Sequence, residues 1–188
     1  MSDRQFTIFG NKYLMGSYIL LIRVSSPFKL AFGRFQQGKL FTISKGNYLY
    51  IGSALGKSGA PLARRLLRHA SRSGEKHPHE IRTAMRTLFS KNDLIATFAI
   101  KPSKKQLRWH IDYLLDQPEA EITHIVIIRS PERLEHKISE LLEPLEETSA
   151  LASRLGAQDT RNSTHLLKCT DQKKILAQLR KHIPQLSA

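Results

Sequence analysis

An arginine and a histidine lie four residues apart in a segment with the pattern of a helix. Pro61 suits the first turn of that helix, and leucines at a spacing of three or four residues give it one apolar side. Arg65 and His69 would therefore project from the same helix face. A guanidinium can stabilise negative charge, and an imidazole titrates near neutral pH. The pair is typical of a site where a proton moves beside an anion.

A glycine-rich segment, residues 52–59, precedes this helix. Backbone N–H groups in such a loop can hold a phosphate. Only three residues separate Gly52 from Gly56, whereas the nucleotide-binding P-loop needs four between its glycines, so an NTPase is not favoured. We expect a loop that contacts phosphate without hydrolysing a nucleotide.

Positive charge is concentrated in one part of the chain. The 188 residues include thirty Lys and Arg and sixteen Asp and Glu, a net charge of +14, and residues 61–109 hold twelve basic and three acidic ones. Nucleic acid is the partner class that such an excess favours; a merely soluble basic surface and a contact with anionic membrane are the alternatives. The expected nucleic-acid contacts are Gly52, Ser53, Lys57, Arg64, Arg68, Lys104 and Lys105.

Several other classes of protein are excluded or disfavoured. Cys169 is the single cysteine, so there is no intramolecular disulfide, and the N-terminus lacks a signal segment, which predicts a cytoplasmic protein. The longest apolar stretch, residues 18–22, is too short to cross a bilayer. His77 and His79 have no cysteines nearby for a zinc site, no Gly-x-Ser-x-Gly element indicates a serine hydrolase, and no protein partner can be identified.

Hydrophobic periodicity predicts a mixture of strands and helices. We expect strands at residues 16–24, 39–44, 48–51, 94–100, 122–129 and 164–169. Helices are expected from Pro61, at 80–89, at 107–115, from Ser130 as its cap to Pro144, and at 171–182. The resulting fold class is α+β, with a small central sheet flanked by helices.

The triplets Gly16-Ser-Tyr18 and Tyr50-Ile-Gly52, followed by the arginine-bearing helix, resemble successive elements of the GIY-YIG nuclease core. Further segments are similar to the Uri-type branch of that superfamily: Tyr50 to Ala54, Leu62-x-x-Arg65-x-x-Arg68-His69, Trp109 to Leu115, Gly156 to Asp159, and Thr164 to Leu166. The resemblance spans residues 16–166. It implies a domain over residues 13–170, with 71–108 as an inserted basic segment, followed by a basic helix at 171–188.

The resemblance also implies roles for particular residues. Tyr18 and Tyr50 would flank the nucleophilic water, Arg65 would contact the scissile phosphate, and Glu135 would hold a single Mg²⁺ or Mn²⁺. One carboxylate is enough for magnesium, which keeps several of its waters. A phenol with a pKa near ~10 is a poor base at neutral pH unless its surroundings lower that pKa, so His69 is a second candidate for proton transfer. The further candidates for supporting positions are His110, Asp112 and His165.

Each assignment has a structural alternative. The two tyrosines could be ordinary sheet residues with a hydrated hydroxyl, and Trp109 a core anchor. The rivals are Arg64 and Arg68 for the phosphate contact, and Glu132 and Glu140 for the metal ligand. We expect a metal-dependent endonuclease that hydrolyses DNA phosphodiesters, and selectivity for DNA structure is left open. The alternative is a noncatalytic nucleic-acid-binding module on the same fold, and action on RNA is not excluded.

Overall fold

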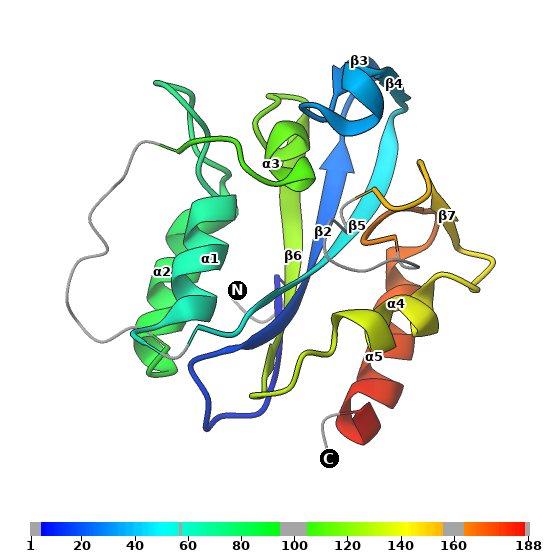
Figure 1. Ribbon diagram of the computed structural model, residues 1–188. Helices are drawn as coiled ribbons and strands as arrows, with labels where there is room; N and C mark the ends of the chain where they lie inside the picture. The colour runs from blue at the N-terminus through cyan, green and yellow to red at the C-terminus, as the bar shows by residue number, and fades with distance from the viewer. Residues whose placement is uncertain (1–4, 57, 95–104, 156–163, 187–188) are drawn as a thin grey trace.

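A six-stranded mixed sheet forms the centre of the molecule in a computed structural model (Figure 1), which describes residues 5–56, 58–94, 105–155 and 164–186. The strand order is β1-β6-β2-β5-β8-β7, in which only β1 and β6 run parallel. Its strands are β1 (Phe6–Phe9), β2 (Gly16–Val24), β5 (Gly46–Ala54), β6 (Ala120–Arg129), β7 (Thr148–Ala150) and β8 (Leu166–Cys169). The expected α+β class with a central sheet flanked by helices is confirmed.

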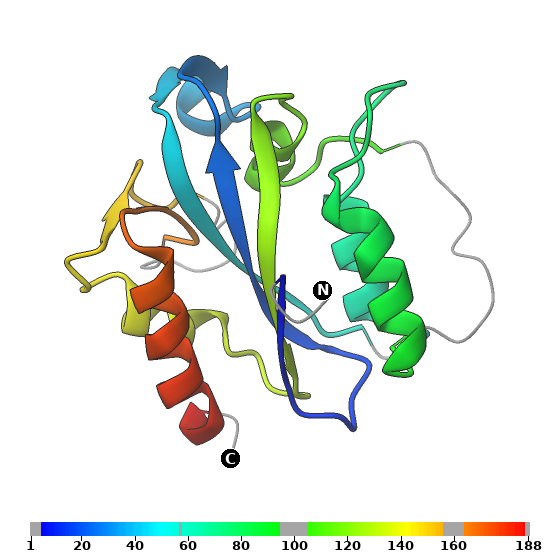
Figure 2. The same ribbon diagram turned by 180° about the vertical axis from the view of Figure 1, so that it is seen from behind.

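Helices cover both faces of this sheet. They are α1 (Pro61–His69), α2 (Ile81–Lys91), α3 (His110–Leu115), α4 (Glu135–Leu142) and α5 (Gln172–Leu186). The first three helices lie on one side and the last two on the other (Figure 1, and from behind in Figure 2). A separate hairpin of β3 (Phe28–Ala31) and β4 (Leu40–Ile43) lies at one end, with the short 3-10 helix η2 (Phe35–Gly38) between its strands.

Strand β2 shows why the sheet needs both helical layers. Tyr18, Leu20 and Ile22 point into the core that α1, α2 and α3 share, whereas Ile19 and Leu21 point into the core under α4 and α5. Because side chains alternate across a strand, a run that is apolar at every position must be buried on both faces. The strand expected at residues 16–24 is confirmed.

Strand β5 is longer than its sequence pattern suggests. It pairs with β2 from Gly46 to Ala54, with Tyr18 opposite Gly52. The start of the predicted glycine-rich loop is therefore strand, and that part of the prediction was wrong. Ladder hydrogen bonds to β2 hold Gly52 and Ser53 in extended conformation, an effect that local composition could not reveal.

The basic segment at residues 71–108 contributes to the core. Ile81, Met85 and Phe89 of α2 are fully buried in the cluster that contains Tyr18 and Leu20. The strand expected at 94–100 lies, except for its first residue, outside the described residues. Helix α5 packs three buried side chains against the opposite face of the sheet and extends to Leu186.

The segment before α4 differs from its prediction. The helix begins at Glu135 rather than near Ser130, and the Ser130 hydroxyl accepts a hydrogen bond from the Glu132 N–H at 3.2 Å. Ser130 thus closes a local turn and does not cap the helix. Helix α4 ends at Leu142, before Pro144, as expected. Within the described ranges, no helix is long and apolar enough to cross a membrane.

Candidate active site on the α1 face of the sheet

Two tyrosines and a histidine meet where β2, β5 and α1 come together. The Tyr18 hydroxyl and His69 Nε2 lie 2.8 Å apart, and the Tyr50 ring centroid lies 6.0 Å from the His69 centroid and 6.3 Å from that of Tyr18. All three side chains are buried. Pairing of β2 with β5 aligns the tyrosines, and His69, in the last turn of α1, lies over them.

Gly52 makes room for this arrangement. A Cβ atom at this position would lie 2.5 Å from the Tyr18 hydroxyl and 2.6 Å from its ring carbon Cζ. Real Cβ atoms do not approach so closely, so any other residue would push the phenol away from His69. Gly52 was expected to contact nucleic acid, but it is buried and its visible role is steric.

Burial keeps the Tyr18–His69 pair neutral at ordinary pH. It lowers the pKa of His69 to about 4 and raises the pKa of Tyr18 well above its usual value. His69 Nδ1 faces the Asp112 carboxylate at 3.6 Å, which favours the tautomer with the proton on Nδ1. Nε2 then accepts the hydrogen bond that the Tyr18 hydroxyl donates. The site has an unprotonated nitrogen ready next to a phenol.

The Asp112 carboxylate is the anchor of this side of the site. It accepts two hydrogen bonds from the Arg68 guanidinium, at 2.9 and 2.7 Å, and two from the backbone N–H groups of Arg108 and Trp109. Burial alone would raise the pKa of Asp112, but His69 and these donors together hold it well below its usual range. Asp112 therefore remains ionised and fixes both Arg68 and the start of α3.

The Trp109 ring contacts two arginines and the histidine of the site. The Arg65 guanidinium carbon lies 4.0 Å from the centroid of its ring and that of Arg68 lies 4.4 Å away, both within cation–π distance. The ring also packs edge-on to His69 at 6.2 Å. Arg68 is already bound to Asp112, whereas Arg65 has no ion pair among the described residues. Of the two arginines, Arg65 is the one available to an external anion.

Glu135 reaches the tyrosines from the start of α4. Ser17, the middle residue of the first triplet, is fully buried, and its hydroxyl accepts a hydrogen bond from the N–H of Leu134 at 3.1 Å. This bond ties the residue before Glu135 to β2. After burial, the Glu135 charge is the largest influence that raises the pKa of Tyr50, and it also raises that of Tyr18. Both phenols therefore feel the charge of the Glu135 carboxylate.

Arg65 acts on the same two groups with the opposite sign, because its charge lowers the pKa of both tyrosines. Four side chains from four separate elements, those of Tyr18, Tyr50, Arg65 and Glu135, thus interact electrostatically at one place. The rival carboxylates differ. Glu132 and Glu140 are 57% and 64% exposed and pair with Lys137 and His136, whereas Glu135 is 14% exposed.

A divalent cation could use Glu135 as its protein ligand. No group of three or more His, Cys, Asp or Glu side chains suitable for a metal occurs in the ranges that the structure describes. A hard cation such as Mg²⁺ can bind through one carboxylate oxygen and keep its waters, so the donor set fits magnesium better than zinc. Among the described residues, Glu135 pairs with Arg133 at 3.7 Å, and the Arg133 side chain is more than half exposed. The site fits a one-carboxylate magnesium ion.

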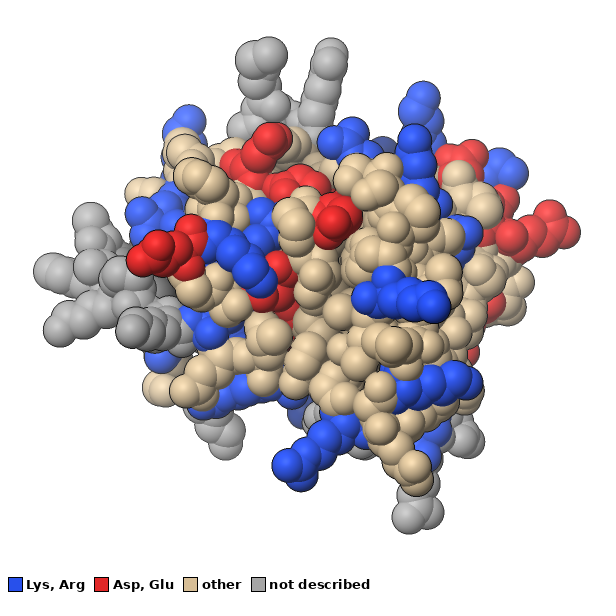
Figure 3. Space-filling model, turned by 90° about the horizontal axis from the view of Figure 1, so that it is seen from above, with Lys and Arg blue, Asp and Glu red and all other residues tan. Residues whose placement is uncertain are grey.

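The residues predicted to contact nucleic acid differ in whether their side chains are exposed, engaged by other residues, or buried. Arg64 is exposed at the surface of α1, but Arg68 is engaged by Asp112 and Trp109. Lys105 is buried, donates to the Ser71 carbonyl at 2.6 Å, and has its pKa lowered by burial to about 8, so it was wrongly assigned to the surface. Lys57 and Lys104 lie outside the described residues. Other basic side chains are spread over the end of the molecule seen in Figure 3, with acidic ones among them.

The remaining candidates lie at the border of the site. The His165 carbonyl accepts a hydrogen bond from the Ile51 N–H, which places this residue beside β5 next to Tyr50. His110 packs against Phe35 with a centroid distance of 4.9 Å. Sequence reasoning missed the roles of Ser17 and Trp109. The polar residue between Gly16 and Tyr18 in a buried strand was the available signal, because a buried hydroxyl needs a partner.

Comparison with known proteins gives one family. The model of "Domain of unknown function DUF123" matches residues 17–188, which includes every residue of the site. Neither the curated proteins nor the solved structures compared with the chain gave a match. Since the family model covers nearly the whole sequence, the chain belongs to the DUF123 family.

Proposed function

We propose that this protein is a divalent-metal-dependent endonuclease that hydrolyses DNA phosphodiesters, in accordance with its resemblance to the GIY-YIG nucleases of the Uri type. One observation carries the proposal: a buried Tyr18–His69 hydrogen bond lies where the charges of Arg65 and Glu135 act together on Tyr18 and Tyr50. Phosphodiester hydrolysis needs a base for water, positive charge for the phosphorane-like transition state and a metal ligand. This cluster offers each of them.

Protons would move along the Tyr18–His69 pair. As a water molecule attacks phosphorus, its proton passes to the Tyr18 oxygen, and the Tyr18 proton passes to Nε2 of His69. Asp112 faces Nδ1 and stabilises the imidazolium that results. Attack by the water oxygen breaks the bond from phosphorus to the leaving deoxyribose oxygen, which takes up a proton from solvent water. Because Tyr18 gives up one proton as it gains another, its raised pKa does not have to be overcome in a separate step.

Arg65 and Glu135 would act on the phosphate. The Arg65 guanidinium, held against Trp109, would meet the charge that develops on the nonbridging oxygens. Glu135 would hold the Mg²⁺ or Mn²⁺, which when bound supplies Lewis acidity to the phosphate. Tyr50, whose pKa is raised by burial and by the Glu135 charge, would orient the attacking water.

Single-turnover cleavage of plasmid, branched, nicked and single-stranded DNA, over a Mg²⁺ titration, tests the proposal. Arg65→Ala and Glu135→Gln should each slow cleavage by about 10²-fold or more while DNA affinity falls less. Glu140→Gln removes an exposed carboxylate from the same helix α4 and should leave the rate unchanged. Circular dichroism would verify that each variant is folded. Folded variants that cut at the wild-type rate, or wild-type cleavage that is independent of metal, would refute the mechanism.

A noncatalytic nucleic-acid-binding module is the second candidate. The raised pKa of both tyrosines favours it, because phenols that remain protonated at neutral pH cannot act as bases without a relay. This candidate predicts metal-independent binding of DNA or RNA and no cleavage of either. An RNA substrate whose cleavage requires the 2′-hydroxyl would instead indicate an RNA-processing enzyme.

A further inference from the structure

A cavity of about 690 Å³ lies next to the site, between η2, α3 and the segment after β7. Its lining residues are Phe32, Gly33, Arg34, Phe35, Gln36, Arg108, His110, Tyr113, Ser153 and Arg154. Arg108 and His110 flank Trp109, the residue that contacts Arg65 and His69, so the cavity adjoins the proposed scissile phosphate position. The volume lies within the range of about 300–1,000 Å³ that holds small ligands.

Three cations line this cavity, and no carboxylate among the described residues does. Arg34, Arg108 and Arg154 are all exposed, and none forms an ion pair with any residue that the structure describes. Elsewhere in the molecule, arginines with a structural role are paired, as Arg68 is with Asp112 and Arg72 with Glu121. Three unneutralised guanidinium groups around one hollow are the complement of a ligand with more than one negative charge.

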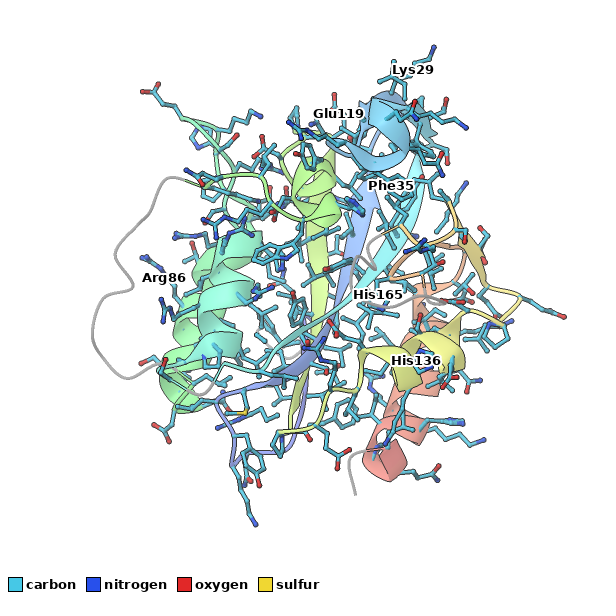
Figure 4. The ribbon with its side chains drawn as sticks, viewed as in Figure 1. Lys29, Phe35, Arg86, Glu119, His136 and His165 are labelled. Atoms are coloured by element: carbon cyan, nitrogen blue, oxygen red, sulfur yellow. The ribbon has the colours of Figure 1, made fainter. Side chains whose placement is uncertain are left out.

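Aromatic rings form the other part of the lining. Phe35 is half-buried and packs at 4.9 Å on His110, while Tyr113 and Phe32 complete the aromatic part. Figure 4 shows Phe35 at the end of the molecule that bears β3, and His165 between that end and α4. Rings beside cations form the combination on which single-stranded nucleic acids bind, with bases stacked and phosphates paired to arginine.

The backbone around the cavity is held in an uncommon conformation. Gln36 and Arg154, which both line it, have positive φ angles of 45° and 64° although neither is glycine. Such conformations cost of order 1–3 kcal/mol and cluster where a ligand is held. Arg154 thus combines a left-handed backbone conformation with a guanidinium group that lines the cavity.

We infer that this cavity, named here the Arg34–Arg108–Arg154 pocket, binds one nucleotide of a single strand adjacent to the scissile phosphate. Phe35 and His110 would stack against the base, and the three arginines would contact the phosphates on either side of it. This inference rests on the proposed nuclease function and extends it: the substrate must offer an unpaired nucleotide beside the cut. Single-stranded, flapped or branched DNA is then preferred to an intact duplex.

Fluorescence anisotropy with a labelled twelve-residue oligothymidylate, without metal and over a salt series, tests the pocket. The variant with Arg34, Arg108 and Arg154 all changed to Ala should bind at least tenfold more weakly. Its slope of log affinity against log salt should be smaller by about 1.4, since two phosphates flank the bound nucleotide and each neutralised phosphate on a single strand contributes about 0.7. The matched control changes Lys173, Arg180 and Lys181, three exposed cations of α5 on the opposite face, to Ala. Equal losses in the two variants would overturn the inference.

Phe35→Leu tests stacking while retaining an apolar side chain under η2. The wild type should prefer oligothymidylate to an abasic strand of the same length by about fivefold or more, and Phe35→Leu should reduce that preference. An unchanged preference would refute stacking. Thymidine monophosphate that competes as well as the strand would show that the pocket takes a free nucleotide, which also overturns the assignment.

Cleavage measured on the same variants separates this inference from the proposed function. If the protein binds single strands through the pocket but cuts no DNA, the pocket inference stands and the proposed nuclease function is wrong. If the wild type cuts DNA and the triple-arginine variant cuts as fast and binds as tightly, the proposed nuclease function stands and the pocket inference is wrong.

Discussion

Replacing Asp112 with asparagine removes the charge that holds the α1–α3 side of the site together. The substitution Asp112→Asn keeps the size of the side chain and one oxygen that can accept from the backbone N–H groups of Arg108 and Trp109. That oxygen occupies the Oδ2 position, so the amide N–H₂ replaces Oδ1, which accepts from the Arg68 guanidinium at 2.9 Å. One charge-assisted hydrogen bond is thereby lost in a buried place, and the other, at 2.7 Å, keeps only a neutral acceptor.

The magnitude follows from these contacts. A hydrogen bond to a charged group contributes about 1.5–3 kcal/mol, and Arg68 is one-quarter exposed, so water compensates part of the loss. We expect the free energy of unfolding to fall by about 2 kcal/mol for Asp112→Asn. Asp112→Ala leaves all four donors without their acceptor and should cost about 3–5 kcal/mol. Small domains have about 5–15 kcal/mol of stability, so the asparagine variant stays folded.

Urea unfolding measures this effect. With a slope of about 2 kcal/mol per molar, the midpoint should drop by about 1 M. Fluorescence of Trp109, the single tryptophan, reports on the site, and circular dichroism reports on the whole fold. Glu140→Gln, an exposed carboxylate on α4, should leave the midpoint unchanged. A midpoint for Asp112→Asn equal to that of the wild type would refute the reasoning.

The pH dependence provides a second check. The folded-state pKa of Asp112 is depressed, so its contribution is complete above the unfolded pKa of about 3.9 and is lost as pH falls below it. The difference in stability between wild type and Asp112→Asn should be constant from about pH 7 to pH 5 and should shrink below about pH 4. A difference that instead changes between pH 5 and 7 would mean that another group dominates.

Three further predictions concern the Tyr18–His69 pair. Gly52→Ala should move the phenol and destabilise the protein by about 1–3 kcal/mol, whereas Gly56→Ala, whose Cβ would meet only an ordinary contact at 3.5 Å, should have little effect in the same urea experiment. Tyr18→Phe leaves the buried Nε2 of His69 without its donor and should lower stability by about 1–3 kcal/mol as well as cleavage; unaltered stability would contradict the hydrogen bond. Because the folded-state pKa of His69 is lowered to about 4, its neutral form stabilises the protein fully above about pH 6.5, and stability should decline as pH falls from there toward 4. His69→Gln should remove that part of the decline. A pH profile of stability identical to that of the wild type would rule out His69 as its cause.

Sequence reasoning predicted the elements with strong periodicity. Strand β2 is apolar on both faces, and α1 has leucines on one side, so burial could decide their conformation before any tertiary contact was known. Short edge strands such as β1 and β7 were missed because their pairing partners are distant in the sequence and their own residues show little pattern. Strand β5 extended into the glycine-rich segment for the same reason: the ladder with β2 outweighed local preference.

The sequence by itself determined which residues could do chemistry: a basic chain, a helix with Arg65 and His69 on one face, and two tyrosines in neighbouring strands. Tertiary structure alone decided which of them meet. It tied Arg68 to Asp112, buried Lys105, and fixed the residue before Glu135 to β2 through the hydroxyl of Ser17. It also left Glu132 and Glu140 exposed but covered most of Glu135. It also gathered three arginines from β3–β4, α3 and the β7 side around one cavity. These contacts join residues that are tens of positions apart in the sequence. Local sequence patterns cannot indicate which of them meet, because the packing of helices on the sheet decides it.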